Sequence, residues 1–207
     1  MAPKVKFQRK EIVAAALEAV REKGIDAATA REVAQRLGVS TRPIFTWYRT
    51  MDQLRRDVFA MAMERYRAYI ESGLAEPIPF QGVWRQYLRF AQQEPELYKL
   101  LFLTPPDGAM GGAMEALTFS QALARPSIMA TYRMDQQAAD NFFRDIWLAA
   151  FSYATLIVTG NCPYSLEEIL AVGAELSLSV CKAYKEVPGL VEGTYDKDAV
   201  FRQLVAE

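Results

Sequence analysis

The 207-residue chain contains no histidine and only two cysteines, Cys162 and Cys181. Without histidine it cannot form a Ser-His-Asp or Cys-His catalytic arrangement, and it lacks the commonest metal ligand of proteins. The two cysteines are too far apart for a CxxC motif and too few for a disulfide framework. No P-loop or GxGxxG motif is present either. We therefore expect no catalytic residue, no metal and no cofactor.

Long hydrophobic segments are also missing. The longest nearly apolar run, residues 146–158, is 13 residues long, whereas a helix needs about 20 to cross a bilayer. The first ten residues lack the apolar core of a secretory signal. We therefore expect a cytoplasmic protein with no membrane contact, and we interpret 146–158 as a buried helix.

Charge is unevenly distributed along the chain. The net charge is −1, but residues 1–50 contain ten Lys/Arg and five Asp/Glu, whereas residues 51–207 contain 14 and 20. A basic segment on an acidic remainder suggests an anionic partner such as nucleic acid. A chance imbalance in a short segment is the alternative.

Apolar residues recur with helical spacing throughout the chain, and no segment shows the alternation of a series of strands. Ile12, Ala16 and Val20 begin the first such stripe, which Gly24 ends. The sequence therefore predicts an all-α fold. The expected helices cover about 12–23, 30–37, 41–48, 51–72, 80–91, 97–103, 114–132, 136–160, 166–185 and 196–207.

Several expected helices begin with a capping residue. Thr29, Thr50 and Ser165 each stand three residues before a Glu or Gln, the pattern of a capping box. Ser40 and Asp135 are the expected caps of the helices that follow them.

A second pattern links the two short helices 30–37 and 41–48. Ala34 is small enough to let two helices cross closely, and Gly38 can adopt a positive φ without strain. Val39 and Ile44 are expected to fill the space between the helices, with Trp47 beside them. Two short helices joined by a glycine-containing turn form a helix-turn-helix. An ordinary helical hairpin is the alternative.

Residues 11–56 resemble the DNA-binding domain of the tetracycline-repressor (TetR) family. The resemblance is carried by the segments Thr29-Ala-Arg-Glu-Val-Ala, Leu37-Gly-Val-Ser40, Ile44-Phe-Thr-Trp-Tyr48 and Thr50-Met-Asp-Gln-Leu54. It implies an N-terminal three-helix helix-turn-helix domain, residues 1–50, and a larger helical effector-binding and dimerisation domain, residues 51–207. The connecting helix would be 51–72. The implied function is ligand-responsive transcriptional regulation, by default repression relieved by a small molecule.

The third helix of such a domain enters the major groove with its first residues toward the bases. The exposed candidates there are Thr41, Arg42, Pro43 and Thr46. Arg42 is expected to contact guanine, with a phosphate contact as the alternative. By resemblance, the residues that touch phosphates are Thr29, Arg31, Trp47 and Thr50, and Ser40 and Tyr48 complete the expected DNA-binding set.

The sequence departs from the family at two positions, where phosphate contacts are not expected: Phe45 replaces a frequent Tyr, and Met51 replaces a frequent Lys. We interpret the Trp47 ring as mainly core, with its indole N–H directed outward. A basic arm before the first helix is a candidate for further DNA contact, or else a solvated tail. It contains Lys4, Lys6, Arg9 and Lys10.

The C-terminal half is expected to form a dimer. Segment 146–158 is apolar nearly all round and should be covered on more than one side. Because operators are two-fold symmetric, a homodimer through helices 136–160 and 165–185 is a more natural cover than a monomer core. Two such pairs would form a four-helix bundle.

The same half is rich in aromatic residues and methionine, which can line an adaptable apolar pocket. A plain hydrophobic core is the alternative. The residues predicted to line an effector pocket, by resemblance to the family, are Trp84, Tyr87, Phe102, Met114, Phe143 and Trp147. The effector itself is unknown.

Two other functions compete with DNA binding. One is a helical enzyme, which the missing histidine and phosphate-binding motifs disfavour. The other is a protein-binding adaptor that has kept the helix-turn-helix shape, which the basic charge of residues 1–50 disfavours.

Overall fold

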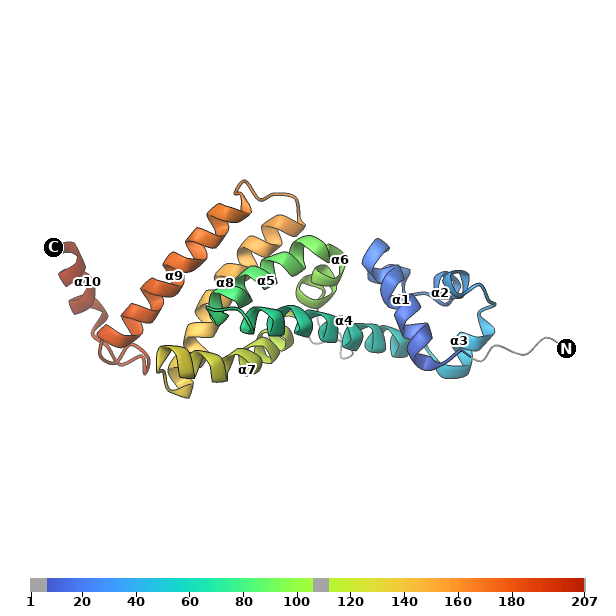
Figure 1. Ribbon diagram of the computed structural model, residues 1–207, viewed down its shortest axis with the longest axis horizontal. Coiled ribbons are helices and arrows are strands. Elements are labelled where there is room, and N and C mark those ends of the chain that lie inside the picture. The colour runs from blue at the N-terminus through green and yellow to red at the C-terminus, as the bar shows by residue number, and fades with distance from the viewer. Residues whose placement is uncertain (1–6, 106–111, 207) are drawn as a thin grey trace.

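A computed structural model describes residues 7–105 and 112–206, and within these ranges the chain forms helices and no strand (Figure 1). The predicted all-α fold is confirmed. The helices are α1 (Arg9–Lys23), η1 (Ile25–Ala27), α2 (Ala30–Leu37), α3 (Arg42–Trp47), α4 (Met51–Leu74), α5 (Pro79–Gln93), α6 (Pro95–Tyr98), η2 (Lys99–Leu103), α7 (Gly112–Tyr132), α8 (Gln136–Val158), α9 (Leu166–Glu186) and α10 (Lys197–Ala206).

Helices α1 to α3 form a small unit at one end of an elongated molecule, here called the head (Figure 1). Its centre is made by Ile12, Val33 and Ile44, all fully buried. The turn between α2 and α3 is made by Gly38, whose φ of 66° and ψ of 33° lie in the left-handed region, as predicted. Helix α4 leads from the head into the remaining helices, here called the body.

Four of the five predicted caps are present, and only one of the three predicted capping boxes has both hydrogen bonds. The Ser165 hydroxyl accepts from the Glu168 N–H, and the Glu168 carboxylate accepts from the Ser165 N–H. At Thr29 and Thr50 only the hydroxyl half forms. Asp135 caps α8 by accepting from the Ala138 N–H. The helix starts therefore follow from local sequence, whereas the second half of a box competes with other partners.

Two glycines allow α4 and α5 to pack in close contact. A Cβ on Gly73 would lie 2.6 Å from the backbone of Gly82 and Val83, and a Cβ on Gly82 would lie 2.2 Å from the Gly73 carbonyl oxygen. Both distances are shorter than any tolerable contact. The two residues thus fix how α5 folds back along α4 and how the body begins.

In the body, α8 lies beside α5 on one side and α9 on the other (Figure 1). The first half of α8 buries one face, with Phe142, Phe143 and Ile146 each at most 2% exposed. Its second half is less covered, and Leu148 is 48% exposed. Within the described ranges, no helix combines the length and hydrophobicity needed to cross a membrane.

Candidate nucleic-acid interface and buried cavity

Helix α3 is anchored by one side and exposed on the other. Ile44 and Tyr48 are buried beneath it, whereas Phe45 and Trp47 are more than half exposed. All but one of the residues predicted to touch DNA are at least partly exposed. Those that are exposed are Arg31, Ser40, Thr41, Arg42, Thr46, Trp47 and Thr50, and those that are half-buried are Thr29 and Pro43.

The exception is Tyr48, which is only 1% exposed. Its hydroxyl donates to the Asp57 carboxylate of α4 and accepts from the Arg9 Nε of α1 at 3.3 Å. Arg9 also donates to Asp57 from Nε at 2.7 Å and from a terminal nitrogen at 2.8 Å. Burial and the Asp57 carboxylate raise the pKa of Tyr48 to about 12. The structure therefore places Tyr48 in the joint between the head and α4, where it is not exposed to a partner.

Two further details of α3, at Ser40 and Trp47, differ from expectation, and a third, at Thr46, agrees with it. The residue before the helix is Thr41, and no side chain caps the helix, so the prediction that Ser40 caps it is wrong. The Thr46 hydroxyl donates to the Arg42 carbonyl oxygen at 3.1 Å, which leaves its methyl group outward. The Trp47 ring is half exposed while its Nε1 donates to the Phe7 carbonyl oxygen at 2.9 Å, the reverse of the predicted orientation.

The basic arm is only partly described. Lys4 and Lys6 lie outside the described residues. Arg9 is held by Asp57, and Lys10 is exposed. Contact between the basic arm and DNA therefore stays a prediction.

Some cations of the head are paired with carboxylates, and others are not. Lys23 pairs with Glu32, and Arg36 pairs with both Glu22 and Glu32. Hydrogen bonds from these cations lower the pKa of both carboxylates. By contrast, within the described residues no ion pair is formed by Arg31, Arg42 or Arg49. These three exposed arginines, in α2, in α3 and just after α3, are available to an anionic partner.

A buried carboxylate joins the head to the body. Glu94, between α5 and α6, is 4% exposed. It accepts from Arg21 of α1 at 2.7 and 2.8 Å and from the Arg65 Nε of α4 at 2.7 Å. The hydrogen bonds to Glu94 are the main cause of a raised pKa for Arg21. We call this group the Glu94 cluster.

A cavity of about 20 Å³ lies between α4, α5 and α8 in the body. Four of the residues predicted to bind a ligand line it: Trp84, Tyr87, Phe143 and Trp147. Phe102 does not line it, but its ring packs against the rings of Tyr87 and Trp147, with centroids 5.4 and 6.2 Å apart. Met114 is elsewhere, 65% exposed on α7.

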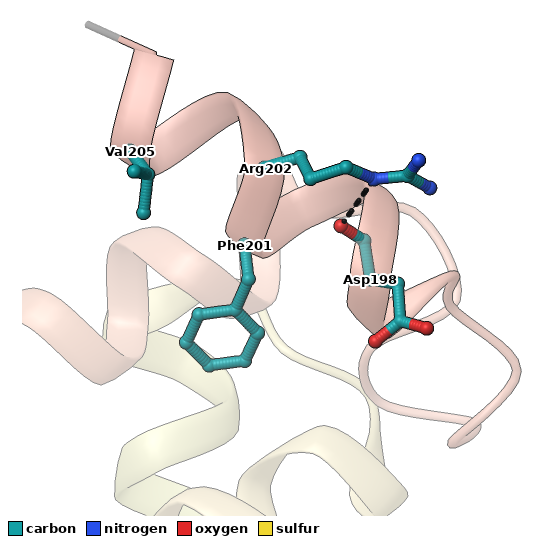
Figure 2. A pocket seen from close by; sticks show the side chains of 4 residues that line it. All are labelled: Asp198, Phe201, Arg202 and Val205. Carbon is teal, nitrogen blue, oxygen red and sulfur yellow. Dashed lines mark hydrogen bonds between the residues drawn. The ribbon is translucent and has the colours of Figure 1, made fainter.

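A much larger hollow, about 620 Å³, lies on the surface beside α10. Figure 2 shows that Phe201 and Val205 project from one side of this helix, while the Arg202 Nε bonds to the Asp198 carbonyl oxygen at 3.1 Å. All four residues are exposed, so the hollow lacks walls that would shield a small molecule from water. None of the predicted site residues lies there.

The head matches a known family of proteins. Residues 12–58 match the family model described as bacterial regulatory proteins, tetR family. The N-terminal head belongs to the TetR family. No curated protein sequence matches the chain.

Solved structures of regulators share the fold over most of the chain. The fatty acid degradation regulator FadR from Bacillus halodurans has a TM-score of 0.57, with 16% identity over 83% of this chain and 93% of that one. A transcriptional regulator from Rhodococcus sp. Rha1 has a TM-score of 0.58, with 14% identity over 86% and 97%. The TetR family repressor AlkX from Dietzia sp. has 0.53, with 15% identity over 91% and 100%. The chain thus has the fold of DNA-binding transcriptional regulators.

Both α8 and α9 carry exposed apolar side chains. Leu148 is 48% exposed, Leu166 37%, and Leu178 70%. This is the surface that the sequence predicts to be a dimer interface.

Sequence reasoning missed two parts of this TetR-type molecule. Tyr66 and Ile70 of α4 also line the cavity, and their spacing from the buried Ala62 would have placed them on the inner face of the helix. Glu94 carried no such signal, because its partners come from other helices.

Proposed function

We propose that this TetR-type chain is a homodimeric repressor that binds a two-fold symmetric operator and releases it when a small molecule enters the body. The observation that carries the proposal is the unpaired positive charge of Arg31, Arg42 and Arg49 on the outer side of a TetR-family head. A protein-binding adaptor would not require that charge.

Arg42 is the main candidate for base recognition. It is exposed in the first turn of α3, the part of a recognition helix that meets base edges. Its guanidinium can bind guanine bidentately, and the Thr46 methyl can contact a thymine methyl. Arg31, Thr29 and Thr50 are proposed to hold phosphates, the two threonines by placing the first turns of α2 and α4 toward the backbone.

Dimerisation is proposed to use the uncovered face of α8 and α9. A single α3 would hold DNA weakly, whereas two heads related by a two-fold axis match a palindromic site. Replacing Leu178 with Glu puts a charge on this face and is expected to increase the monomer fraction in analytical ultracentrifugation. The control is Met114→Glu, an equally exposed apolar residue on α7. Equal behaviour of both variants would contradict this interface.

The small molecule is proposed to act through the Glu94 cluster. Phe102 sits on η2 beside the cavity, η2 follows α6, and α6 begins next to Glu94. A ligand that displaces η2 would favour a state in which Arg21, and with it α1, takes another position. FadR is a fatty acid degradation regulator, and AlkX is implicated in the biodegradation of n-alkanes. These names support a ligand for this chain that is mainly hydrocarbon, which agrees with the apolar cavity lining, but they do not define its polar group.

The experiment is selection of a binding sequence from random DNA, followed by affinity measurements over a salt series. Arg42→Ala is expected to weaken binding to the selected sequence by about 1–3 kcal/mol and to weaken binding to unrelated DNA much less. Arg89→Ala, an exposed arginine of α5, is the control. Equal losses on both DNAs would reassign Arg42 to a phosphate. Absence of sequence-specific, salt-dependent binding would reject the function and favour the adaptor.

A further inference from the structure

The cavity between α4, α5 and α8 carries no charge. Its lining contains no Asp, Glu, Lys or Arg among the described residues, and its only ionisable groups are the phenols of Tyr66 and Tyr87. Burial raises the pKa of both hydroxyls well above the usual range. Both therefore stay neutral at physiological pH, and the cavity offers no partner for an ion.

One donor at the cavity wall lacks an acceptor. Trp147 is 6% exposed, and its Nε1 is buried without a hydrogen-bond partner among the described residues. The N–H approaches the Tyr66 hydroxyl without forming a bond of normal geometry. That hydroxyl is engaged with the Ser120 Oγ at 2.8 Å, and Ser120 Oγ donates to the Ala116 carbonyl oxygen at 2.6 Å.

Trp84 provides an internal comparison. Among the described residues its Nε1 also lacks a partner, but its indole packs against Gly173 of α9, where a Cβ would lie 2.6 Å from the nitrogen. The Trp84 ring therefore contacts α9 as well as lining the cavity. Trp147 lines the cavity close to Tyr66. Buried donors without acceptors are rare in folded proteins, so the Trp147 N–H marks a position for an acceptor atom.

We propose that the cavity binds an uncharged, mainly apolar molecule whose single oxygen acceptor, such as a ketone carbonyl, receives the Trp147 indole N–H. This inference names the chemistry of the ligand in the proposed function. It rests on the proposed function only where it identifies the bound molecule as the effector. A carboxylate would lose its hydration and meet no cation there. A hydrocarbon would leave the N–H without a partner. Because about 20 Å³ holds roughly one water, the molecule must also push the surrounding rings apart.

Three aromatic probes of similar size test the chemistry: acetophenone, ethylbenzene and benzoate. Each is titrated against the full chain by ligand-observed NMR, for the wild type, Trp147→Phe and Trp84→Phe. The two neutral probes differ in hydrophobicity, so the informative quantity is how each substitution changes their ratio of affinities. Trp147→Phe is expected to weaken acetophenone about fivefold relative to ethylbenzene, the loss of one neutral hydrogen bond. Trp84→Phe is expected to leave that ratio unchanged, and benzoate is expected not to saturate.

A second measurement does not depend on the variants folding. In the wild type, acetophenone is expected to move the indole ¹H–¹⁵N resonance of Trp147 downfield, and ethylbenzene is not. Equal effects of the two tryptophan substitutions, saturable benzoate binding, or no acetophenone binding would each overturn the proposal. Operator affinity is measured separately with acetophenone present. If acetophenone binds as expected but leaves DNA binding unchanged, ligand-controlled release fails while the binding chemistry stands.

Discussion

Helix α4 is held at two places by polar clusters that differ in burial. Near its start, Asp57 meets Arg9, with side chains 26% and 57% exposed. Farther along, Arg65 meets Glu94, whose side chain is only 3% exposed. Each cluster also includes a group from the head, Tyr48 in the first and Arg21 in the second.

The difference in burial decides how much each cluster contributes. A surface ion pair is well hydrated when broken, so it contributes little to stability. A buried carboxylate cannot recover its hydration, so the loss of its partners is costly. We therefore expect the outer cluster, made by Arg9, Tyr48 and Asp57, to contribute less to the attachment of the head than the Glu94 cluster, which joins α1 to the body.

The largest expected effect comes from Glu94→Gln. The amide keeps the shape but leaves the Arg65 guanidinium without its carboxylate partner, and leaves Arg21 with only the exposed Glu18. Because both arginines are partly exposed, we expect a loss of about 2–4 kcal/mol in the free energy of unfolding, at the lower side of values for broken buried pairs. Urea denaturation followed by circular dichroism measures it. Glu96→Gln, which breaks an exposed pair with Lys99, is the control and should cost below about 1 kcal/mol. Equal costs would remove the distinction between the clusters.

This contrast also separates what the sequence could predict from what it could not. The turn at Gly38 and the burial of Ile44 depend on neighbours within a few residues, so spacing and caps predicted them. Glu94 lies 73 residues from Arg21, and nothing near it in sequence distinguishes it from an exposed acid before a proline. Its burial depends on how α1, α4 and α5 pack.

The same distinction between local sequence and long-range packing applies to the candidate sites. The exposed face of α3 follows from helical periodicity once Ile44 is placed inside. Tyr48 was expected on that face, but it lies one residue past the end of α3, where the extended backbone turns its ring toward Asp57. Met114 was expected in the pocket by resemblance to the family, which does not tell which side of α7 faces inward in this chain.

Denaturation at alkaline pH tests how much Tyr48 contributes to the stability of the outer cluster. Its pKa is raised to about 12 in the folded protein, against about 10 in the unfolded chain. The folded state therefore holds the proton more tightly, and this contribution is complete below pH 10 and lost as the pH rises through 12. We expect Tyr48 to contribute up to about 2 kcal/mol of the stability lost over that range. Tyr48→Phe should flatten the decline in denaturation curves recorded across it. Buried tyrosines such as Tyr66 and Tyr87 also have raised pKa values and account for the rest of the decline. A slope that is unchanged in Tyr48→Phe would therefore contradict the contribution assigned to Tyr48.

At neutral pH, Tyr48→Phe has a smaller effect. The variant loses the hydrogen bond to Asp57, whose carboxylate keeps both Arg9 contacts. We expect a loss of about 1–2 kcal/mol, measured by the same urea denaturation. Tyr164→Phe, which removes a hydroxyl from a half-exposed ring, should change little. A loss as large as that of Glu94→Gln would show that the outer cluster is the stronger attachment.

Arg9→Ala should have the smallest effect and also tests the basic arm. The Arg9 guanidinium is exposed, and its charge is matched by Asp57 at 2.7 Å. Its contribution to the melting temperature is therefore expected to be slight and to disappear at about 0.5 M salt. For the same reason it should release few counterions from DNA, so operator affinity should fall less than about threefold and less than in Arg42→Ala. If Arg9→Ala weakened DNA binding as much as Arg42→Ala, the arginine would have to leave Asp57 on the operator, and the outer cluster would be part of the DNA-binding surface.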